Sequence, residues 1–266
     1  MNKVFNFKRF GKYFVYDIRN AWNNFGLSML VCALLPLLCF AVAQLFSLII
    51  NGVFSEHLEV SRWMAICIAP VVVILTAPNK IYGKITRNRE GSDFILLPAS
   101  VTEKYVSMLL TLCVVLPFAF LFVLFACDSL LCLLFPLKYG STIFSMLSGH
   151  NLFNLTFPEF SGEIGINVGL YLIQVWVIYI LAFNLGAIFF KKAKVAKTIL
   201  VFIGIGIVLS MISAIFFGSF DVQDFIETMS PMRSLDLLNN FIAGCASVEI
   251  IVLLVLTFLR LKTIKH

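Results

Sequence analysis

The side chains best able to do chemistry are polar groups set inside long apolar runs. Glu249 lies within the last apolar run, where a charge at mid-bilayer costs about 2.5–3.5 kcal/mol on insertion scales. Glu249 is therefore either a polar contact in a path or subunit seam, or a protonated or locally hydrogen-bonded glutamate near the outer leaflet. Three amides within the runs, Gln44, Gln174 and Asn184, are better suited to hydrogen bonds between helices.

Sequence motifs of common catalytic sites are absent. The chain has no G-x-x-x-x-G-K-[ST], so it cannot bind ATP by a P-loop, and no H-E-x-x-H or G-x-S-x-G. The three histidines, His57, His150 and His266, lie far apart in the sequence, and the seven cysteines form no C-x-x-C pair. These spacings argue against a metal centre and a disulfide framework. We expect no catalytic residue, no metal and no cofactor.

The composition is that of a membrane protein. The chain is 61% hydrophobic and 13% charged, whereas a soluble domain is about half apolar and a quarter charged. Six apolar runs each approach the roughly 20 residues that cross a bilayer as a helix. They cover residues 27–50, 62–79, 106–127, 166–190, 197–218 and 241–259. We therefore expect an all-α polytopic membrane protein with a single transmembrane domain over residues 1–266. The apolar residues 129–137 are expected to form a re-entrant or interfacial piece.

Charge is distributed by segment in a way that sets the topology. Of the 20 basic residues, only Arg62, Lys138 and Arg233 lie outside four segments, which are residues 1–25, 80–104, 191–197 and 260–266. Most acidic residues lie in the alternating segments 51–62, 128–164 and 219–240. The positive-inside rule then places both termini in the cytoplasm and residues 219–240 in an outer loop, in an inner (cytoplasmic) membrane. This arrangement also explains the net charge of +6 without a nucleic-acid partner.

The first basic segment, residues 5–25, has helical amphipathicity. Aromatic and aliphatic residues share one face, and cations and amides occupy much of the rest. The apolar residues are Phe7, Phe10, Phe14, Ile18 and Trp22. A helix of this kind lies in the membrane interface. The alternative is a basic tail that only sets topology.

The second basic segment contains the longest polar interruption on the predicted cytoplasmic side, residues 87–104, RNREGSDFILLPASVTEK. Ser92 or Asp93 can cap the short run that follows, and Pro98 ends that run. Ser100 and Glu103 have the spacing of a capping box, which predicts a new helix from Ser100. Taken alone, this pattern is equally that of an ordinary capped loop.

This loop resembles the cytoplasmic loop between helices two and three of type-2 ABC exporter permeases. The matching residues are Arg89, Glu90, Gly91, Ser92, Leu96, Leu97, Pro98, Ser100 and Lys104. The resemblance implies that the loop, with Asp93 and Glu103, is a coupling element that docks on a separate ABC ATPase. It also implies that two permease copies or paralogues pair, and that the chain catalyses nothing itself. The interfacial helix and the six-span layout resemble the same family. The chain is short, with no large outer domain, which leaves the substrate open.

Small residues recur every four positions in the fifth apolar run. They are Gly206, Ser210, Ala214 and Gly218. Such a ridge lets another helix approach closely, either within one bundle or between two copies, and the segment 243–247 could meet it.

Two other classes of function remain open from the sequence. An ATP-independent transporter would have more ionisable residues within its spans and an inverted repeat, and neither is evident. A membrane scaffold or immunity-type protein, which binds partners without moving a substrate, is also compatible with the sequence.

Overall fold

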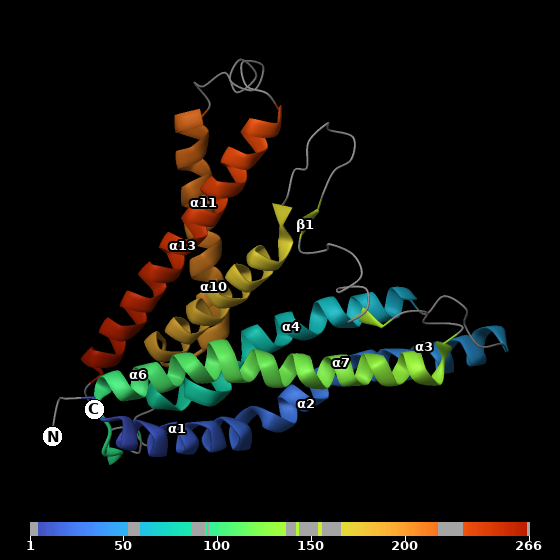
Figure 1. Cartoon of the computed structure of the whole chain (residues 1–266), viewed down its shortest axis with the longest axis horizontal. Helices are drawn as coiled ribbons and strands as arrows, with labels where there is room; N and C mark the ends of the chain where they lie inside the picture. Colours follow the sequence, from blue (N-terminus) through green and yellow to red (C-terminus); the bar gives the residue numbers. More distant parts are fainter. Residues whose placement is uncertain are drawn as a thin grey trace. The chain divides into compact units, whose positions relative to one another are not determined.

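The protein is an all-α polytopic membrane protein, seen here in a computed structural model (Figure 1). The structure describes residues 5–52, 59–86, 94, 96–136, 142–143, 154–155, 166–217 and 231–264. Among these residues, five helices are long and apolar enough to cross a membrane, and a bent pair brings the number to six. The chain divides into two compact units: Met1–His150 with Leu261–His266, and Asn151–Arg260.

The first unit is built from three long helical stretches. The first comprises α1 (Phe7–Ala21), the π-helix η1 (Trp22–Gly26), α2 (Leu27–Ala33) and α3 (Leu35–Asn51). The second comprises α4 (Glu59–Tyr82) and the 3-10 turn η2 (Gly83–Thr86). The third comprises α6 (Val101–Leu110), the π-helix η3 (Thr111–Val115) and α7 (Leu116–Leu134). In this unit α4 packs on α2 and α3, α7 packs on the same pair, and α1 packs on α6.

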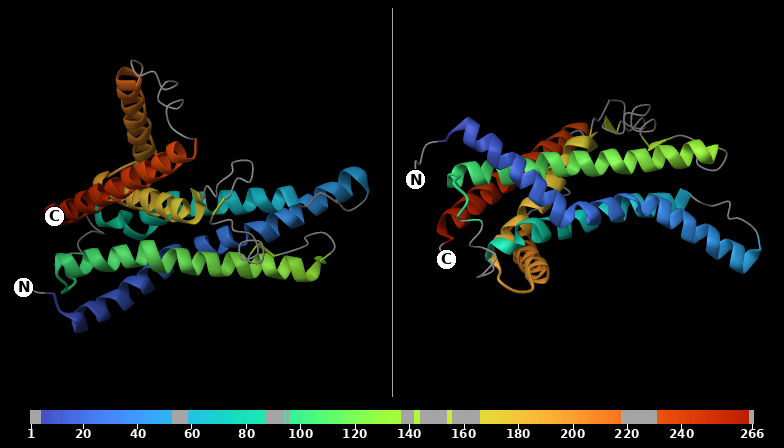
Figure 2. Two further views of the ribbon diagram at one scale, coloured as in Figure 1. Left: turned by 45° about the horizontal axis from the view of Figure 1, so that its top comes forward. Right: turned by 90° about the horizontal axis from the view of Figure 1, so that it is seen from below.

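The first stretch breaks at a different residue from the one expected. The interfacial helix was predicted to end near residue 25, but α1 continues without a break through η1 into α2. The chain instead bends by 43° between α2 and α3, at Leu34 (Figure 2). Pro36 explains the position, because proline lacks an N–H and its ring clashes with the carbonyl four residues earlier.

The third stretch is longer than predicted. Residues 129–134 continue α7, so the described part of 129–137 is not a re-entrant piece. From Val101 to Leu134 the helix has 34 residues, about 51 Å at 1.5 Å per residue. The hydrocarbon core is about 30 Å thick, so this helix is longer than a bilayer crossing along the membrane normal requires.

The core of the first unit depends on a ridge of small residues on α4. Four buried residues, at most 1% exposed, repeat every fourth position: Ala65, Ala69, Val73 and Ala77. Small side chains let neighbouring backbones approach closely, which is how helices pack where lipid removes the hydrophobic drive for association. On α7 the buried residues also follow helical spacing, and include Leu116, Phe120, Leu124 and Leu131.

The second unit contains three long helices and one short strand pair. The strands β1 (Asn154–Leu155) and β2 (Ile166–Asn167) pair antiparallel, ahead of α10 (Val168–Phe189). They are followed by α11 (Lys194–Phe217) and α13 (Pro231–Thr263), whose last residues belong to the first unit. Residues 231–240 of the predicted outer loop 219–240 form the first turns of α13. Residues 218–230 lie outside the described part of the chain.

Helices α10 and α11 meet closely near the turn that joins them. A Cβ added to Gly186 would lie 1.8 Å from Thr198 Oγ1, so only glycine fits there. Lys194 is buried and donates from Nζ to Ala187 O at 2.8 Å, near the C-terminal end of α10. Of the four lysines in the basic segment 191–197, this one satisfies a carbonyl at the end of a helix.

Candidate partner-docking site

The described tip of the predicted coupling loop is apolar and exposed. Leu96 is 78% exposed and Pro98 is exposed, whereas Leu97 is partly covered. Ala99 is buried and its N–H donates to Leu97 O at 2.8 Å, which closes a tight turn. Five residues of the motif lie outside the described part of the chain. These are Arg89, Glu90, Gly91, Ser92 and Asp93.

The capping box predicted after the loop is present. Ser100 Oγ accepts the Glu103 N–H at 3.2 Å, and Glu103 Oε2 accepts the Ser100 N–H at 2.8 Å. The two bonds satisfy donors that the first turn of a helix leaves without partners. The chain therefore changes from loop to helix at Ser100.

Glu103 also holds the beginning of α1. Its carboxylate receives Arg9 Nε and Nη2, both at 2.7 Å, and the Asn6 N–H at 2.8 Å. Asn6 is the N-cap of α1, and its side chain accepts the N–H groups of Lys8 and Arg9. We call these five residues, Asn6, Lys8, Arg9, Ser100 and Glu103, the Glu103 clamp. One carboxylate with no exposed side-chain surface thus lies at the N-termini of two helices, where helix dipoles favour negative charge.

Lys104 ties the loop itself to α6. Its Nζ donates to Phe94 O and lies 4.7 Å from the centre of the Phe94 ring. The hydrogen bond and the cation–π contact hold one described residue of the loop against the first turn of the helix. The exposed tip from Leu96 to Pro98 is thus bounded on both sides by fixed residues.

A second buried cluster holds the other end of α1. Asp17 Oδ2 accepts hydrogen bonds from Ser107 Oγ at 2.6 Å, Tyr82 Oη at 2.8 Å and Thr111 Oγ1 at 3.3 Å. The cluster joins α1 to the end of α4, to α6 and to η3. Sequence reasoning missed it. The available signal was that Asp17 is the one acidic residue in a basic, amphipathic segment.

A buried ion pair closes the opposite end of the first unit. Arg62 Nε and Nη2 donate to Asp128 Oδ1 and Oδ2 at 2.6 and 2.7 Å, with side chains 2% and 1% exposed. Asp128 Oδ2 also accepts the Ile143 N–H at 2.9 Å. Sequence reasoning assigned both charges to loops and missed the pairing. Opposite charges at the start of the second apolar run and the end of the third were the signal.

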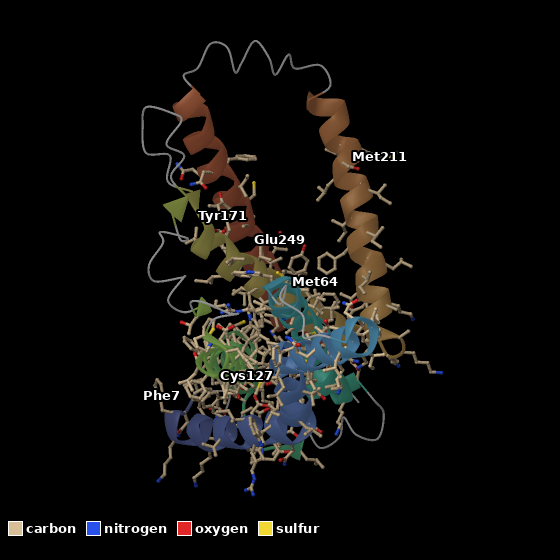
Figure 3. The ribbon with its side chains drawn as sticks, turned by 90° about the vertical axis from the view of Figure 1, so that its right-hand side faces the viewer. Phe7, Met64, Cys127, Tyr171, Met211 and Glu249 are labelled. Atoms are coloured by element: carbon tan, nitrogen blue, oxygen red, sulfur yellow. The ribbon has the colours of Figure 1, made fainter. Side chains whose placement is uncertain are left out.

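The polar residues singled out within the apolar runs have different environments. Glu249 is exposed near the middle of α13 (Figure 3). Gln174 Nε2 lies 3.4 Å from Ala243 O and 3.5 Å from Ser247 Oγ, a long contact from α10 to α13. Asn184 is buried on α10, and Gln44 is partly exposed on α3. Of the three residues that belong to the second unit, Glu249 is exposed, Asn184 is buried and Gln174 contacts α13, so they have no common environment.

The small-residue ridge of α11 is open within one chain. Gly206 and Ser210 are exposed, and a Cβ added to Gly206 would meet nothing within 4 Å. The Ala214 side chain and Gly218 lie outside the described part. Ala243 and Ser247, in the segment that could meet this ridge, lie beside Gln174 of α10. Only 6% of the most apolar stretch of α11 is buried, so within the second unit the described face of this ridge is uncovered.

Comparison with known proteins adds no family assignment. No protein-family model matches the chain, and no curated protein or solved structure is similar enough to match it. Within the described residues, no three His, Cys, Asp or Glu side chains are grouped so as to hold a metal ion. What the first unit offers chemically is an exposed apolar tip beside two helix ends that share one carboxylate.

Proposed function

We propose that the protein is the transmembrane permease subunit of an ABC-type exporter of the type-2 class. In this proposal a separate ABC ATPase docks on the cytoplasmic loop 87–104 and couples ATP hydrolysis to movement of a substrate. A second permease copy or paralogue completes the assembly. Both termini then lie in the cytoplasm, and the protein resides in the inner membrane. The chain itself performs no catalysis.

The Glu103 clamp is the observation that carries the proposal. A docking loop can couple ATP hydrolysis to transport only if a force applied to the loop is transmitted to the membrane helices. Here the loop leads directly into Ser100 and Glu103, and Glu103 is bound to α1 by charge-assisted bonds from Arg9. The Arg9 bonds are bidentate and charge-assisted, and the Glu103 side chain has no exposed surface, so we expect the clamp to move as one body.

The exposed tip supports the same proposal. Leu96 and Pro98 present apolar surface next to rigid neighbours, and the centre of a protein interface is typically apolar with a polar rim. A force applied there would displace α6 and the start of α1 together. Asp17 would pass that displacement to the end of α4 through Tyr82.

A site-specific photo-crosslinker tests the docking. Placed at Leu96, it should capture a protein that carries a P-loop and has ATPase activity. The matched control is Leu133, an equally exposed leucine (81% against 78%) at the far end of α7, which should capture no such protein. An ATPase captured equally from both positions, or from Leu133 alone, would refute the docking role of the loop.

A second variant separates docking from coupling. Glu103→Gln removes the charge of the clamp and leaves Leu96 in place. We expect the ATPase to be captured from Leu96 as before, while the permease-dependent part of its activity is lost. If Glu103→Gln retains full permease-dependent ATPase activity, the clamp does not transmit force. If no ATPase is captured while the protein remains folded in the membrane, the scaffold or immunity-type function is favoured.

A further inference from the structure

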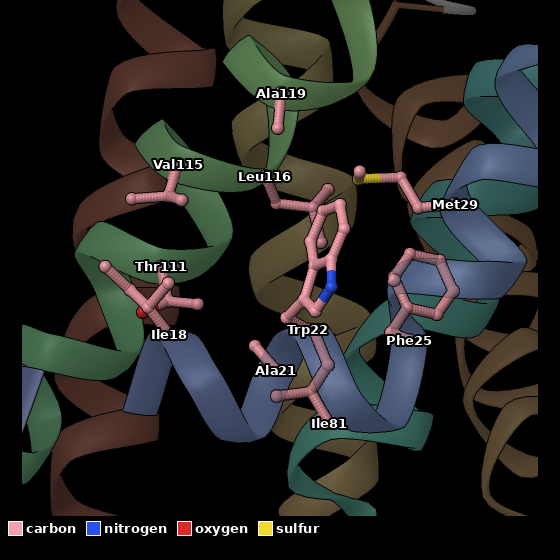
Figure 4. Close-up of a pocket in the computed structure, with 11 residues that line it drawn as sticks. Ile18, Ala21, Trp22, Phe25, Met29, Ile81, Thr111, Val115, Leu116 and Ala119 are labelled. Atoms are coloured by element: carbon pink, nitrogen blue, oxygen red, sulfur yellow. The ribbon is translucent and has the colours of Figure 1, made fainter. Parts of the chain in front are cut away.

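An apolar groove lies where the two π-helices of the first unit face each other (Figure 4). From η1 come Trp22, Phe25 and Gly26, and from η3 come Thr111 and Val115. Ile18, Met29, Ile81 and Ala119 contribute further lining residues from the neighbouring helices. π-Helical turns are rare and recur at functional sites, and here two of them line one groove.

Trp22 forms an outer wall of the groove. Its indole lies against its own helix at Gly26, where an added Cβ would be 2.9 Å from Trp22 Cδ2. Trp22 is 58% exposed although Phe25, which also lines the groove, is 2% exposed, so Trp22 is accessible from outside the groove. Tryptophan is enriched at the level of lipid headgroups, where its ring meets both acyl chains and water.

The size of the groove limits what can occupy it. Its enclosed volume is about 50 Å³. Pockets that enclose a whole drug-sized ligand are about 300–1,000 Å³. The groove therefore fits part of a chain that lies along the surface, rather than a small molecule that is buried whole. Its lining is apolar apart from the Thr111 hydroxyl, which is already bonded to Asp17.

Two exposed lysines, Lys80 near the end of α4 and Lys84 in η2, bond the helix that carries the η1 lining residues. Lys80 Nζ donates to Ser28 Oγ at 2.5 Å, and Lys84 Nζ donates to Asn24 Oδ1 at 2.8 Å. Lys80 Nζ is also 6.0 Å from the centre of the Phe25 ring, which lines the groove. Both lysines are exposed, and neither has a carboxylate partner within the described residues. The site thus combines two positive charges that no described carboxylate neutralises with an apolar groove lined by Phe25.

We propose that this site binds one anionic phospholipid, with its phosphate between Lys80 and Lys84 and one acyl chain along the groove past Trp22. Basic pockets between membrane helices bind anionic headgroups through such an arrangement. The lipid would bridge α4 to η1 and η3, at the junction that Asp17 already joins. This site does not depend on the proposed transport function, because it uses neither the loop 87–104 nor a partner subunit.

Quenching of Trp22 fluorescence by brominated lipids tests the proposal. Trp63→Phe and Trp176→Phe leave Trp22 as the one tryptophan of the chain, since the sequence has three. In this parent variant, reconstituted in phosphatidylcholine nanodiscs, brominated phosphatidylglycerol should quench Trp22 more strongly than brominated phosphatidylcholine at the same mole fraction. Each lysine should contribute about fivefold to the preference for the anionic lipid. Lys80→Gln with Lys84→Gln should remove the preference.

Controls separate this site from general attraction of anionic lipid to a basic protein. Lys191→Gln with Lys192→Gln removes two exposed cations from another part of the chain and should leave the preference unchanged. Added inorganic phosphate should not compete, because the acyl chain contributes to binding. Equal quenching by the two lipids in the parent variant would overturn the proposal. So would a preference that survives the Lys80 and Lys84 substitutions, or one abolished by inorganic phosphate alone.

Discussion

For the buried pair Arg62–Asp128, we predict that one substitution lowers the free energy of unfolding more than substitution of both residues does. Removing one partner of a buried ion pair leaves an uncompensated charge and costs about 3–5 kcal/mol. Asp128→Leu leaves the Arg62 guanidinium, 2% exposed, without its carboxylate. It also deprives the Ile143 N–H of its acceptor, which adds about 1–3 kcal/mol. We therefore expect Asp128→Leu to lower the free energy of unfolding by about 4–8 kcal/mol.

The double variant Arg62→Met with Asp128→Leu should recover most of this loss. Replacement of a whole buried pair by apolar residues is neutral or stabilises by about 1–4 kcal/mol, and the Ile143 N–H loses its Asp128 acceptor. The net change should then lie within about 3 kcal/mol of zero. Unfolding in mixed micelles with increasing SDS measures all variants, and exposed Arg19→Met is the matched control, with an effect below about 0.5 kcal/mol. A double variant less stable than Asp128→Leu would refute this reasoning.

Three further predictions use the same unfolding assay or an assembly assay. Gly186→Ala should destabilise the α10–α11 contact by about 1–3 kcal/mol, because its Cβ would overlap Thr198; a neutral result would show that the helices separate easily. Ala69→Leu on the buried α4 ridge should lower the free energy of unfolding by about 1–3 kcal/mol. Gly206→Leu should leave the stability of a single chain unchanged and alter only the association between copies, which chemical crosslinking measures. Glu249→Gln should change assembly or transport if a second subunit covers this exposed carboxylate, and unchanged values of both would make it a structural residue.

The features predictable from the sequence were those determined by a few neighbouring residues. Six apolar runs anticipate the five spanning helices and the bent pair, because length and hydropathy alone decide whether a helix can span. The helix start at Ser100 was predictable because a capping box is a local pattern of four residues. The amphipathic spacing of residues 5–25 likewise anticipated α1, which buries Tyr13 and Asp17.

Features that depend on partners distant in sequence were not predictable in this way. Arg62 and Asp128 are 66 residues apart, and nothing local marks them as a pair. The ridge from Ala65 to Ala77 was not predicted, because alanine and valine are common in any apolar run. Gly206 was singled out because glycine is the smallest residue in such a run. Both ridges have the same spacing of four, so the pattern alone does not say which of them a neighbouring helix covers.

The Glu103 clamp has a consequence for the order in which the chain is made. Asn6 and Arg9 find their carboxylate 97 and 94 residues further along the chain. At about 5–20 residues per second of synthesis, the first helix must wait roughly 5–20 s before its anchor leaves the ribosome. During that interval its apolar face has only lipid or a chaperone to cover it. Biogenesis of this protein should therefore be most sensitive to truncation between the second and third apolar segments. A chain that ends there has its N-terminal helix at the membrane but lacks the Glu103 carboxylate that binds it.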